Sequence, residues 1–167
     1  MIAYKWPKSL KDILVHAKIP QASSKRPIRN LQGMKKCGKC TVCPYVENLK
    51  IVKSSNDKFN FHLSSAVSCN TSNVIYAIKC SKCNQQYIGQ TGRMFKDRLR
   101  EHLGYIRNCN LSEPTGHHFN LPGHNLSMLK ATIVEKCKTN SKMYRETREE
   151  FFIQKFPTKF KGMNRKL

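Results

Sequence analysis

Four thiol and imidazole side chains in the second half of the chain have the types and spacing of a zinc site. Cys80 and Cys83 form a Cys-x2-Cys pair, and the stretch HHFNLPGH downstream supplies His118 and His124. A Cys-x2-Cys turn points two thiolates at one centre, and two further Cys or His side chains complete a tetrahedral shell. We expect this site to tie the downstream stretch to the turn that carries the thiols. His117 can replace His118 in this set.

A redox role is the alternative for Cys80 and Cys83. Redox Cys-x2-Cys pairs lie at the N-terminus of a helix that follows a strand. Here the pair lies between two short apolar runs, 74–78 and 87–89, that both have the composition of strands. The position therefore favours zinc, with free surface thiols as a further alternative.

A second set of cysteines precedes the first. Its members are Cys37, Cys40, Cys43 and Cys69. Two interlocked Cys-x2-Cys spacings and one distant cysteine fit a zinc site of four thiolates. A segment with so few apolar residues is expected to gain its fold from the metal. In this scheme Cys40 either binds the metal or lies between ligands, and Cys109 and Cys137 have no partner.

A third set contains the groups that hydrolysis of a phosphodiester needs. Its members are Tyr76, Tyr87, Arg98, His102 and Glu149. A base takes a proton from water, a cation balances charge on the phosphorane, and a carboxylate holds a divalent metal. Taken singly, the tyrosines are typical core or edge residues, and the other three are typical of a solvated surface. The combination indicates catalysis.

The elements that must position these residues follow from the apolar pattern. Residues 74–78 and 87–89 form a hairpin that 91–93 closes, and a helix of about 13 residues follows from Met94 or Phe95. A Pro/Gly loop, a strand over 129–135, a helix over 141–156 and a basic tail complete the chain. The predicted fold class is α+β, with a small three-stranded antiparallel sheet flanked by helices and preceded by a zinc-bound Cys-rich module.

In that first helix, an apolar stripe at spacings of four, four and three faces the core, and it consists of Phe95, Leu99, Leu103 and Ile106. Arg98 and His102 are four residues apart and share a neighbouring face. Within the Cys-rich part, strands are expected near 51–52 and 59–63.

The charge divides the chain into three predicted parts. Residues 1–36 carry nine Lys or Arg against one Asp and form a basic part, with a short amphipathic helix over 10–17 and a linker. Residues 37–73 are the Cys-rich zinc segment, and 74–167 form the catalytic domain. The formal charge of +21 indicates a polyanionic partner, with nucleic acid as the first candidate.

No basic amphipathic helix with an aromatic face is found, so no membrane partner is expected. The start, MIAYKWPKSLKD, does not have the pattern of a signal peptide, and no apolar stretch reaches the about 18 residues that span a bilayer. We therefore expect an intracellular protein.

The third set of residues carries a resemblance to a known family. Val74-Ile75-Tyr76, Tyr87-Ile88-Gly89, Arg98-x3-His102, Glu149 and Gly162-Met163-Asn164 together resemble the GIY-YIG nuclease domain. Val74 stands where that motif has its first glycine. The longer pattern closely resembles the endonuclease domain of Penelope-like retroelements, which places a Cys-x2-Cys pair between the two halves of the motif and a His-rich loop downstream.

The resemblance implies a role for each matching residue. Tyr76 would be the general base, Tyr87 would position the water or the phosphate, and Arg98 would stabilise the phosphate. His102 would support proton transfer or contact the phosphate, and Asn164 would brace the site. Glu149 would bind one catalytic Mg2+ or Mn2+, with Glu146 or Glu150 as neighbouring alternatives. An ordinary tyrosine has a pKa of about 10 and is therefore not ionised at neutral pH. For Tyr76 to act as a base, either Arg98 and the metal lower its pKa, or Tyr76 passes its own proton on as charge develops.

The resemblance also implies a function. We expect a nuclear, metal-dependent DNA endonuclease that nicks target DNA and leaves a 3′ hydroxyl. A reverse transcriptase on the same polypeptide, of which this chain would be a C-terminal fragment, would use that end as a primer. DNA is the expected partner, with the element's RNA as a second candidate. The alternatives are a catalytically inactive zinc-stabilised DNA- or RNA-binding module, and a redox or metal-buffering protein.

Overall fold

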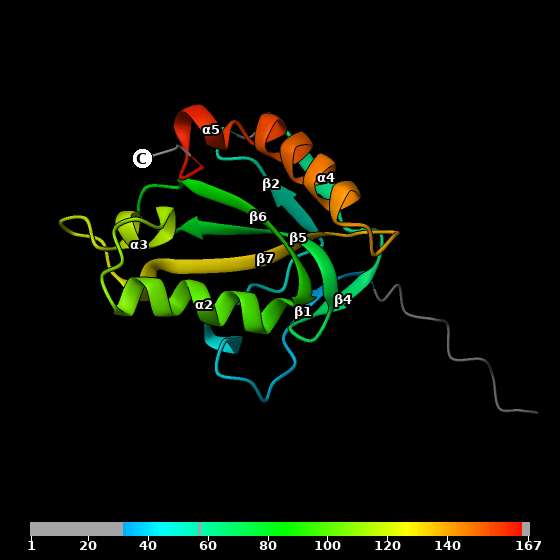
Figure 1. The fold of residues 1–167 in the computed structure, drawn as a ribbon, viewed down its shortest axis with the longest axis horizontal. Helices are drawn as coiled ribbons and strands as arrows, with labels where there is room; N and C mark the ends of the chain where they lie inside the picture. The colour runs from blue at the N-terminus through cyan, green and yellow to red at the C-terminus, as the bar shows by residue number, and fades with distance from the viewer. Residues whose placement is uncertain (1–31, 57, 165–167) are drawn as a thin grey trace, which may run out of the picture. The chain divides into compact units, whose positions relative to one another are not determined.

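The computed structural model describes residues 32–56 and 58–164, and a three-stranded antiparallel sheet forms its centre (Figure 1). The strands are β5 (Ser72–Cys80), β6 (Gln86–Met94) and β7 (Leu129–Lys136), in the order β6-β5-β7. β5 is the middle strand and is buried over most of its length, which suits its β-branched and aromatic residues. The predicted α+β fold with this sheet is confirmed.

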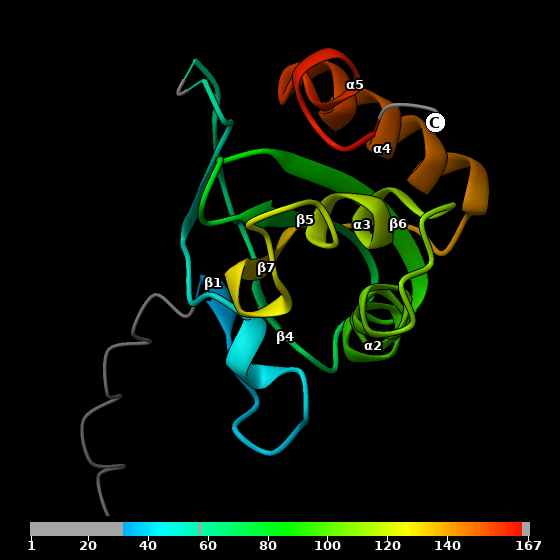
Figure 2. The same ribbon diagram turned by 90° about the vertical axis from the view of Figure 1, so that its left-hand side faces the viewer.

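Two long helices lie on opposite sides of the edge strand β6 (Figures 1 and 2). These are α2 (Phe95–Arg107) and α4 (Lys142–Lys155), close to the bounds expected from the sequence. The predicted stripe of α2 is buried as expected. Ser141 begins α4 as its N-cap, and its side chain accepts a hydrogen bond of 3.4 Å from the Tyr144 N–H. β6 is therefore approached by one helix from each face.

Two short helices lie where the sequence predicts irregular chain. α3 (Pro114–Phe119) occupies the predicted Pro/Gly loop, and α5 (Thr158–Lys161) occupies part of the predicted tail. The Asn120 side chain holds the end of α3, because its Nδ2 donates to the carbonyls of Gly116 at 2.8 Å and Ile106 at 3.0 Å. The loop prediction is wrong because Pro also favours the first turn of a helix, and a six-residue helix is too short to show a period.

The bounds of the hairpin also differ from the prediction. Residues 91–93 were expected to close the hairpin, but they belong to β6, which pairs with β5 as far as Met94. The turn itself lies at 81–85, between the two strands. The thiols of the Cys-x2-Cys pair are therefore at the opposite end of the hairpin from α2.

The Cys-rich segment contains two small sheets. β1 (Gly33–Lys35) pairs in parallel with β4 (Ala66–Ser68), and β2 (Ile51–Lys53) pairs antiparallel with β3 (Asn60–His62). The strands predicted near 51–52 and 59–63 are confirmed. Two 3-10 turns complete the elements, η1 (Cys43–Tyr45) and η2 (Leu126–Met128).

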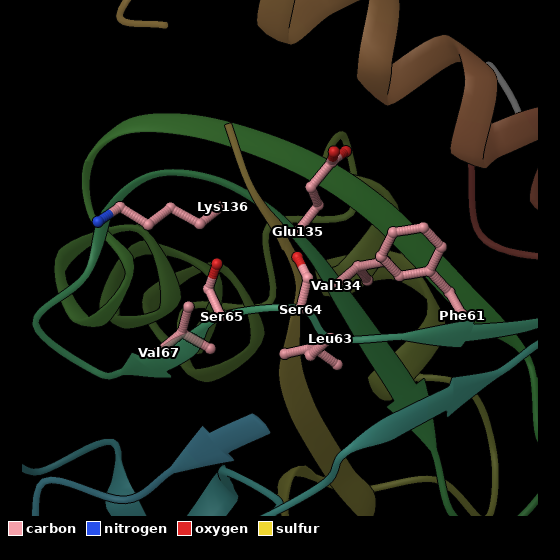
Figure 3. Close-up of a pocket in the computed structure, with 8 residues that line it drawn as sticks. All are labelled: Phe61, Leu63, Ser64, Ser65, Val67, Val134, Glu135 and Lys136. Carbon is pink, nitrogen blue, oxygen red and sulfur yellow. The ribbon is translucent and has the colours of Figure 1, made fainter. Parts of the chain in front are cut away.

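Aromatic and aliphatic contacts join the Cys-rich segment to the main sheet. Phe61 stacks edge-on against Phe152 of α4, with ring centroids 4.9 Å apart. Leu63 and Val67 lie next to Val134, which belongs to β7 (Figure 3). The cavity between them has a volume of only about 10 Å³, so the junction is tightly packed. The two segments share one core. The division at 36/37 and 73/74 stays a prediction, although β1 lies before the first boundary and pairs with β4 beyond it.

The amphipathic helix expected over 10–17 lies outside the described residues. Within 32–56 and 58–164, no helix is long and apolar enough to cross a membrane.

Candidate active site and candidate metal centres

The candidate active site is built around a glycine on the edge strand. Gly89 on β6 lies directly opposite Tyr76 on β5. A Cβ atom at Gly89 would lie only 2.5 Å from the Tyr76 hydroxyl oxygen and 2.8 Å from Cε1 of Tyr87. The two phenol rings lie 6.3 Å apart, centroid to centroid, on this side of the sheet. The absence of a side chain at Gly89 therefore makes the room that Tyr76 occupies.

Helix α2 brings a cation and an imidazole to the Tyr76 hydroxyl. Arg98 donates from Nε to the Tyr76 oxygen at 3.1 Å, and His102 Nε2 lies 2.8 Å from the same oxygen. The four-residue spacing places both groups on one side of the helix. His102 is 1% exposed and Tyr76 is fully buried. The alternative in which His102 lies on a solvated surface is therefore wrong.

His102 has a second partner that the sequence did not reveal. Its Nδ1 lies 2.9 Å from Oγ1 of Thr115, a fully buried residue on α3. The two ring nitrogens are thus both engaged, one by Tyr76 and one by Thr115. No local motif marks Thr115, because it meets His102 only through the packing of α3 on α2.

A carboxylate also fixes Arg98 in place. Glu101, three residues along α2, lies 2.7 Å from Nη1 of Arg98 and 2.5 Å from Nη2 of Arg93. Sequence reasoning missed this residue, although the i, i+3 spacing is a signal that could have found it. Glu101 bridges the two arginines and orients the guanidinium toward Tyr76.

Burial determines the protonation states of this group. It raises the pKa of Tyr76 well above the ordinary value, despite the opposing charge of Arg98. It also raises the pKa of Tyr87. Burial, together with the Arg98 charge, lowers the pKa of His102 to about 3. Tyr76 is therefore a phenol and His102 a neutral imidazole at pH 7. Arg98 lowers the Tyr76 pKa as expected, but burial raises this pKa by more.

Glu149 reaches the site from α4, on the other side of β6. Burial raises its pKa to about 7, against the effects of a backbone hydrogen bond with Gln90 and of the Arg98 charge. Its own charge acts on both Tyr76 and Tyr87. Glu146 and Glu150 are exposed. Of the three glutamates, Glu149 is thus the one that faces the phenols.

Asn164 braces the edge strand next to Gly89. Its Oδ1 accepts a hydrogen bond from the N–H of Ile88, and its Nδ2 donates to the Ile88 carbonyl, both at 2.7 Å. An edge strand otherwise leaves such groups unpaired. The amide therefore stands in for a neighbouring strand at the residue between Tyr87 and Gly89.

The Cys80, Cys83, His118 and His124 side chains meet as predicted from the sequence. Their ligand atoms all lie within 4.8 Å of one another. Cys83 Sγ lies 3.4 Å from His118 Nε2, close to the roughly 3.6 Å that Zn–S and Zn–N bonds give in a tetrahedron. His124 Nε2 is buried and has no hydrogen-bond partner among the described residues. The donors fit zinc, and His118 rather than His117 belongs to the group.

The four cysteines of the other set also come together. Cys43 Sγ lies 3.5 Å from that of Cys37, 3.3 Å from that of Cys40 and 3.7 Å from that of Cys69. Tetrahedral Zn–S bonds place sulfurs about 3.8 Å apart, so this cluster also fits the metal. Cys40 is a member of it. Cys109 is exposed, Cys137 is buried, and neither belongs to a cluster.

The candidate catalytic metal has a different environment. Within residues 32–56 and 58–164, the two Cys/His clusters are the only groups of three or more metal-ligating side chains. Glu149 would therefore be the single carboxylate ligand that the described residues offer to such an ion. Mg2+ commonly binds one or two carboxylates together with waters and substrate phosphates, so Glu149 fits Mg2+ or Mn2+ bound together with a phosphate. The catalytic roles of all these residues stay predictions.

Comparison with known proteins places this geometry in a family. The family model of the GIY-YIG catalytic domain matches residues 72–164, which include both tyrosines, α2, α4 and Asn164. No curated protein and no solved structure matches the chain. The family consists of nucleases, and the matched region is the one that holds the buried Tyr76 centre. The chain belongs to the GIY-YIG family of nuclease domains.

Proposed function

We propose that this protein is a metal-dependent DNA endonuclease that hydrolyses one strand at a time and leaves a 3′ hydroxyl. The observation that carries the proposal is the Tyr76 hydroxyl, which lies 3.1 Å from Arg98 Nε and 2.8 Å from His102 Nε2. A phenol with a cation on one side and a neutral imidazole on the other can exchange a proton without holding a full negative charge.

Tyr76 acts as the base through His102. Its hydroxyl donates to Nε2, which requires the imidazole proton to be on Nδ1, where Thr115 Oγ1 accepts it. As water attacks phosphorus, the bond between phosphorus and the 3′ oxygen breaks, the proton of the water passes to the Tyr76 oxygen, and the Tyr76 proton passes to His102 Nε2. The imidazolium then releases a proton to solvent, because burial and Arg98 keep its pKa near 3, and the leaving 3′ oxygen takes up a proton from solvent. Tyr76 never needs to ionise beforehand.

The other side chains act on charge and position. Arg98 stabilises the negative charge on the phosphorane, and its charge also acts on Tyr87. Tyr87 orients the water or a phosphate oxygen. Glu149 holds a Mg2+ or Mn2+ ion, which supplies Lewis-acid stabilisation of the phosphate when bound. Asn164 keeps β6 straight at Ile88.

Zinc has a structural part in this proposal. Cys80, Cys83, His118 and His124 would fasten α3 to the hairpin, and the four-cysteine site would hold the segment before the nuclease domain. Neither cluster includes a residue of the Tyr76 centre. The two kinds of metal therefore have separate tasks.

We further propose that the protein is the endonuclease of a Penelope-like retroelement and acts in the nucleus. The sequence features that support this are the Cys-x2-Cys pair between the two motif halves, the stretch HHFNLPGH and the cysteines before them. In that setting a reverse transcriptase of the same polypeptide extends the 3′ hydroxyl, with the element's RNA as template. The charge of +21 suits DNA and RNA alike.

Conversion of supercoiled plasmid to open circle, with Mg2+ or Mn2+, tests the proposal. The parent is expected to nick, and Glu149→Ala and Arg98→Ala are expected to bind the plasmid without nicking it. Accumulation of open circle before linear DNA supports nicking, and extension of the products by a polymerase supports a 3′ hydroxyl. If the parent binds but cleaves with neither metal, the zinc-stabilised binding module replaces the nuclease.

A further inference from the structure

A groove lined by lysines lies on the side of the sheet that Tyr76 does not face. It has a volume of about 280 Å³, and its lining includes Lys53 of β2, Lys79 of β5 and Lys130 of β7. We call this the lysine groove. Ala77 lines it, whereas the neighbouring residue Tyr76 turns toward His102 on α2. Because successive strand residues point to opposite faces, the groove and the Tyr76 centre lie on different faces of β5.

The walls of the lysine groove are held in place by the fold. Gln86, which is 2% exposed, donates from Nε2 to the Lys53 carbonyl at 2.8 Å and so fastens β2 to the hairpin. Farther along, the N–H of Glu47 donates to the carbonyl of Ala131 at 2.9 Å. The segment from Glu47 to Lys53 is thus attached to the main sheet at both ends. The backbone that forms this wall of the groove is therefore held by the fold.

Its charges are arranged for an anion. Lys79 and Lys130 are directly opposite each other on neighbouring strands, and both are half-buried. Among the described residues, the ammonium groups of these two and of Lys53 have no hydrogen bond or ion pair. Glu47 is the one carboxylate in the lining, and it forms no ion pair with a described residue either. Like charges facing each other across a sheet are destabilising, and a bound anion relieves this repulsion.

A second hollow continues the basic surface. It has a volume of about 330 Å³, shares Leu49 with the lysine groove, and is lined by Lys35, Lys36 and Lys50. Six lysines therefore follow one continuous surface from β1 across β2 to the main sheet. Apolar side chains such as Val52 and Ala77 lie between them. Alternating ammonium groups and small apolar groups suit the phosphates and sugars of a nucleic-acid backbone.

We propose that the lysine groove binds the phosphodiester backbone of a second segment of the substrate DNA, outside the segment that is cleaved. The identity of the nucleic acid as DNA rests on the proposed function, whereas the site itself rests on the groove. One molecule of DNA then contacts the protein on both faces of the sheet. The lysine groove supplies affinity, and the Tyr76 centre supplies chemistry.

The test compares two triple variants with the same loss of charge, both in a Glu149→Gln background so that binding is measured without cleavage. The groove variant carries Lys53→Gln, Lys79→Gln and Lys130→Gln. The control variant carries Lys58→Gln, Lys136→Gln and Lys138→Gln, which are exposed and do not line the groove. Affinity for a duplex of about 30 base pairs, or three helical turns, is measured by fluorescence anisotropy over a range of salt concentrations.

The groove variant is expected to reduce the slope of log K against log salt by about 2 to 3, since each lost phosphate contact changes it by about 0.9. The control variant is expected to change it by less than about 1. With a duplex of about 10 base pairs, too short to reach both faces, the control variant should bind two copies per chain and the groove variant one.

Equal slopes for the two variants on the long duplex would overturn the proposal. Binding of a single short duplex by both variants would also overturn it, because the groove and the Tyr76 centre would then not hold separate segments. A difference between the variants that appears with single-stranded RNA and not with DNA would reject DNA as the occupant. Failure of plasmid nicking is a separate result, since that assay changes none of these lysines.

Discussion

The hydroxyl of Tyr76 and the imidazole of His102 lie within hydrogen-bond distance, 2.8 Å apart, and both residues are buried. Burial raises the pKa of the phenol and lowers that of the imidazole, so both groups are neutral. The phenol gives its proton to the imidazole as another proton reaches the phenol oxygen, so Tyr76 is never left as a buried anion. Thr115, whose Oγ1 lies 2.9 Å from Nδ1, orients the imidazole for this transfer.

Thr115→Val removes the acceptor at His102 Nδ1 while keeping the volume. The imidazole then loses its preference for the proton on Nδ1, so we expect the nicking rate at saturating DNA to fall by about tenfold or more, with DNA affinity unchanged. Thr115→Ser keeps the oxygen and should retain most activity. The measurement is the single-turnover nicking rate against pH. A rate for Thr115→Val equal to that of the parent, in a folded protein, would remove Thr115 from the mechanism.

Gly89→Ala should displace Tyr76. The added methyl group would lie 2.5 Å from the phenol oxygen, and an error of about 1 Å in a catalytic group typically costs about 100-fold in rate. Gly104→Ala is the matched control, because nothing lies within 4 Å of a Cβ atom there. That change should leave nicking intact and stabilise α2 by up to about 1 kcal/mol. Similar activity of the two variants would contradict this account of the site.

Glu149 should make stability depend on pH. Burial raises its pKa to about 7, so between about pH 4.3 and 7 the folded protein binds a proton that the unfolded chain has released. The free energy of unfolding without Mg2+ should therefore fall as the pH rises through this range, by about 1 to 2 kcal/mol after allowance for solvent.

Glu149→Gln should abolish that fall, and Glu150→Gln, at an exposed position, should not. Urea unfolding at several pH values measures this free energy. Nicking in Mg2+ should rise toward pH 7 as the carboxylate forms. A Glu149→Gln protein with the same pH dependence as the parent would show that another group is responsible.

Zinc content should follow the two clusters. We expect two zinc ions per chain in the parent and one in Cys83→Ser, with a loss of about 4 kcal/mol or more in stability. Cys109→Ser should keep both ions, because that thiol is exposed and lies outside both clusters. His124→Ala should behave like Cys83→Ser, and His117→Ala like the parent. Elemental analysis of the purified proteins measures this, and two ions in Cys83→Ser would disprove the assignment.

The sequence predicts those parts of this structure that have a local period or a local spacing. The stripe from Phe95 to Ile106 gives α2, and the three Cys-x2-Cys spacings mark the thiols of both metal clusters, because each of these patterns is local. The more distant ligands, Cys69, His118 and His124, were expected from their residue types. The position of Thr115 could not be predicted in this way. Its partner is 13 residues away, and the helix that carries it is six residues long.

The environment of a residue is likewise set by distant chain. His102 has the spacing of a surface residue, yet it is buried by β5, β6 and α3, and only the assembled fold reveals this. The lysine groove has the same origin. Lys79 and Lys130 are far apart in sequence and become neighbours through strand pairing, so no motif announces them.

Helix α3 connects the zinc chemistry to the nuclease chemistry. It carries Thr115, the partner of His102, and three residues later His118, a candidate zinc ligand. A helix of six residues is not stable on its own and relies on its attachments. Release of zinc from His118 would free α3, and with it the oxygen that holds the His102 proton in place. Loss of a zinc ion that fastens α3 would in this way slow nicking as well as lower stability.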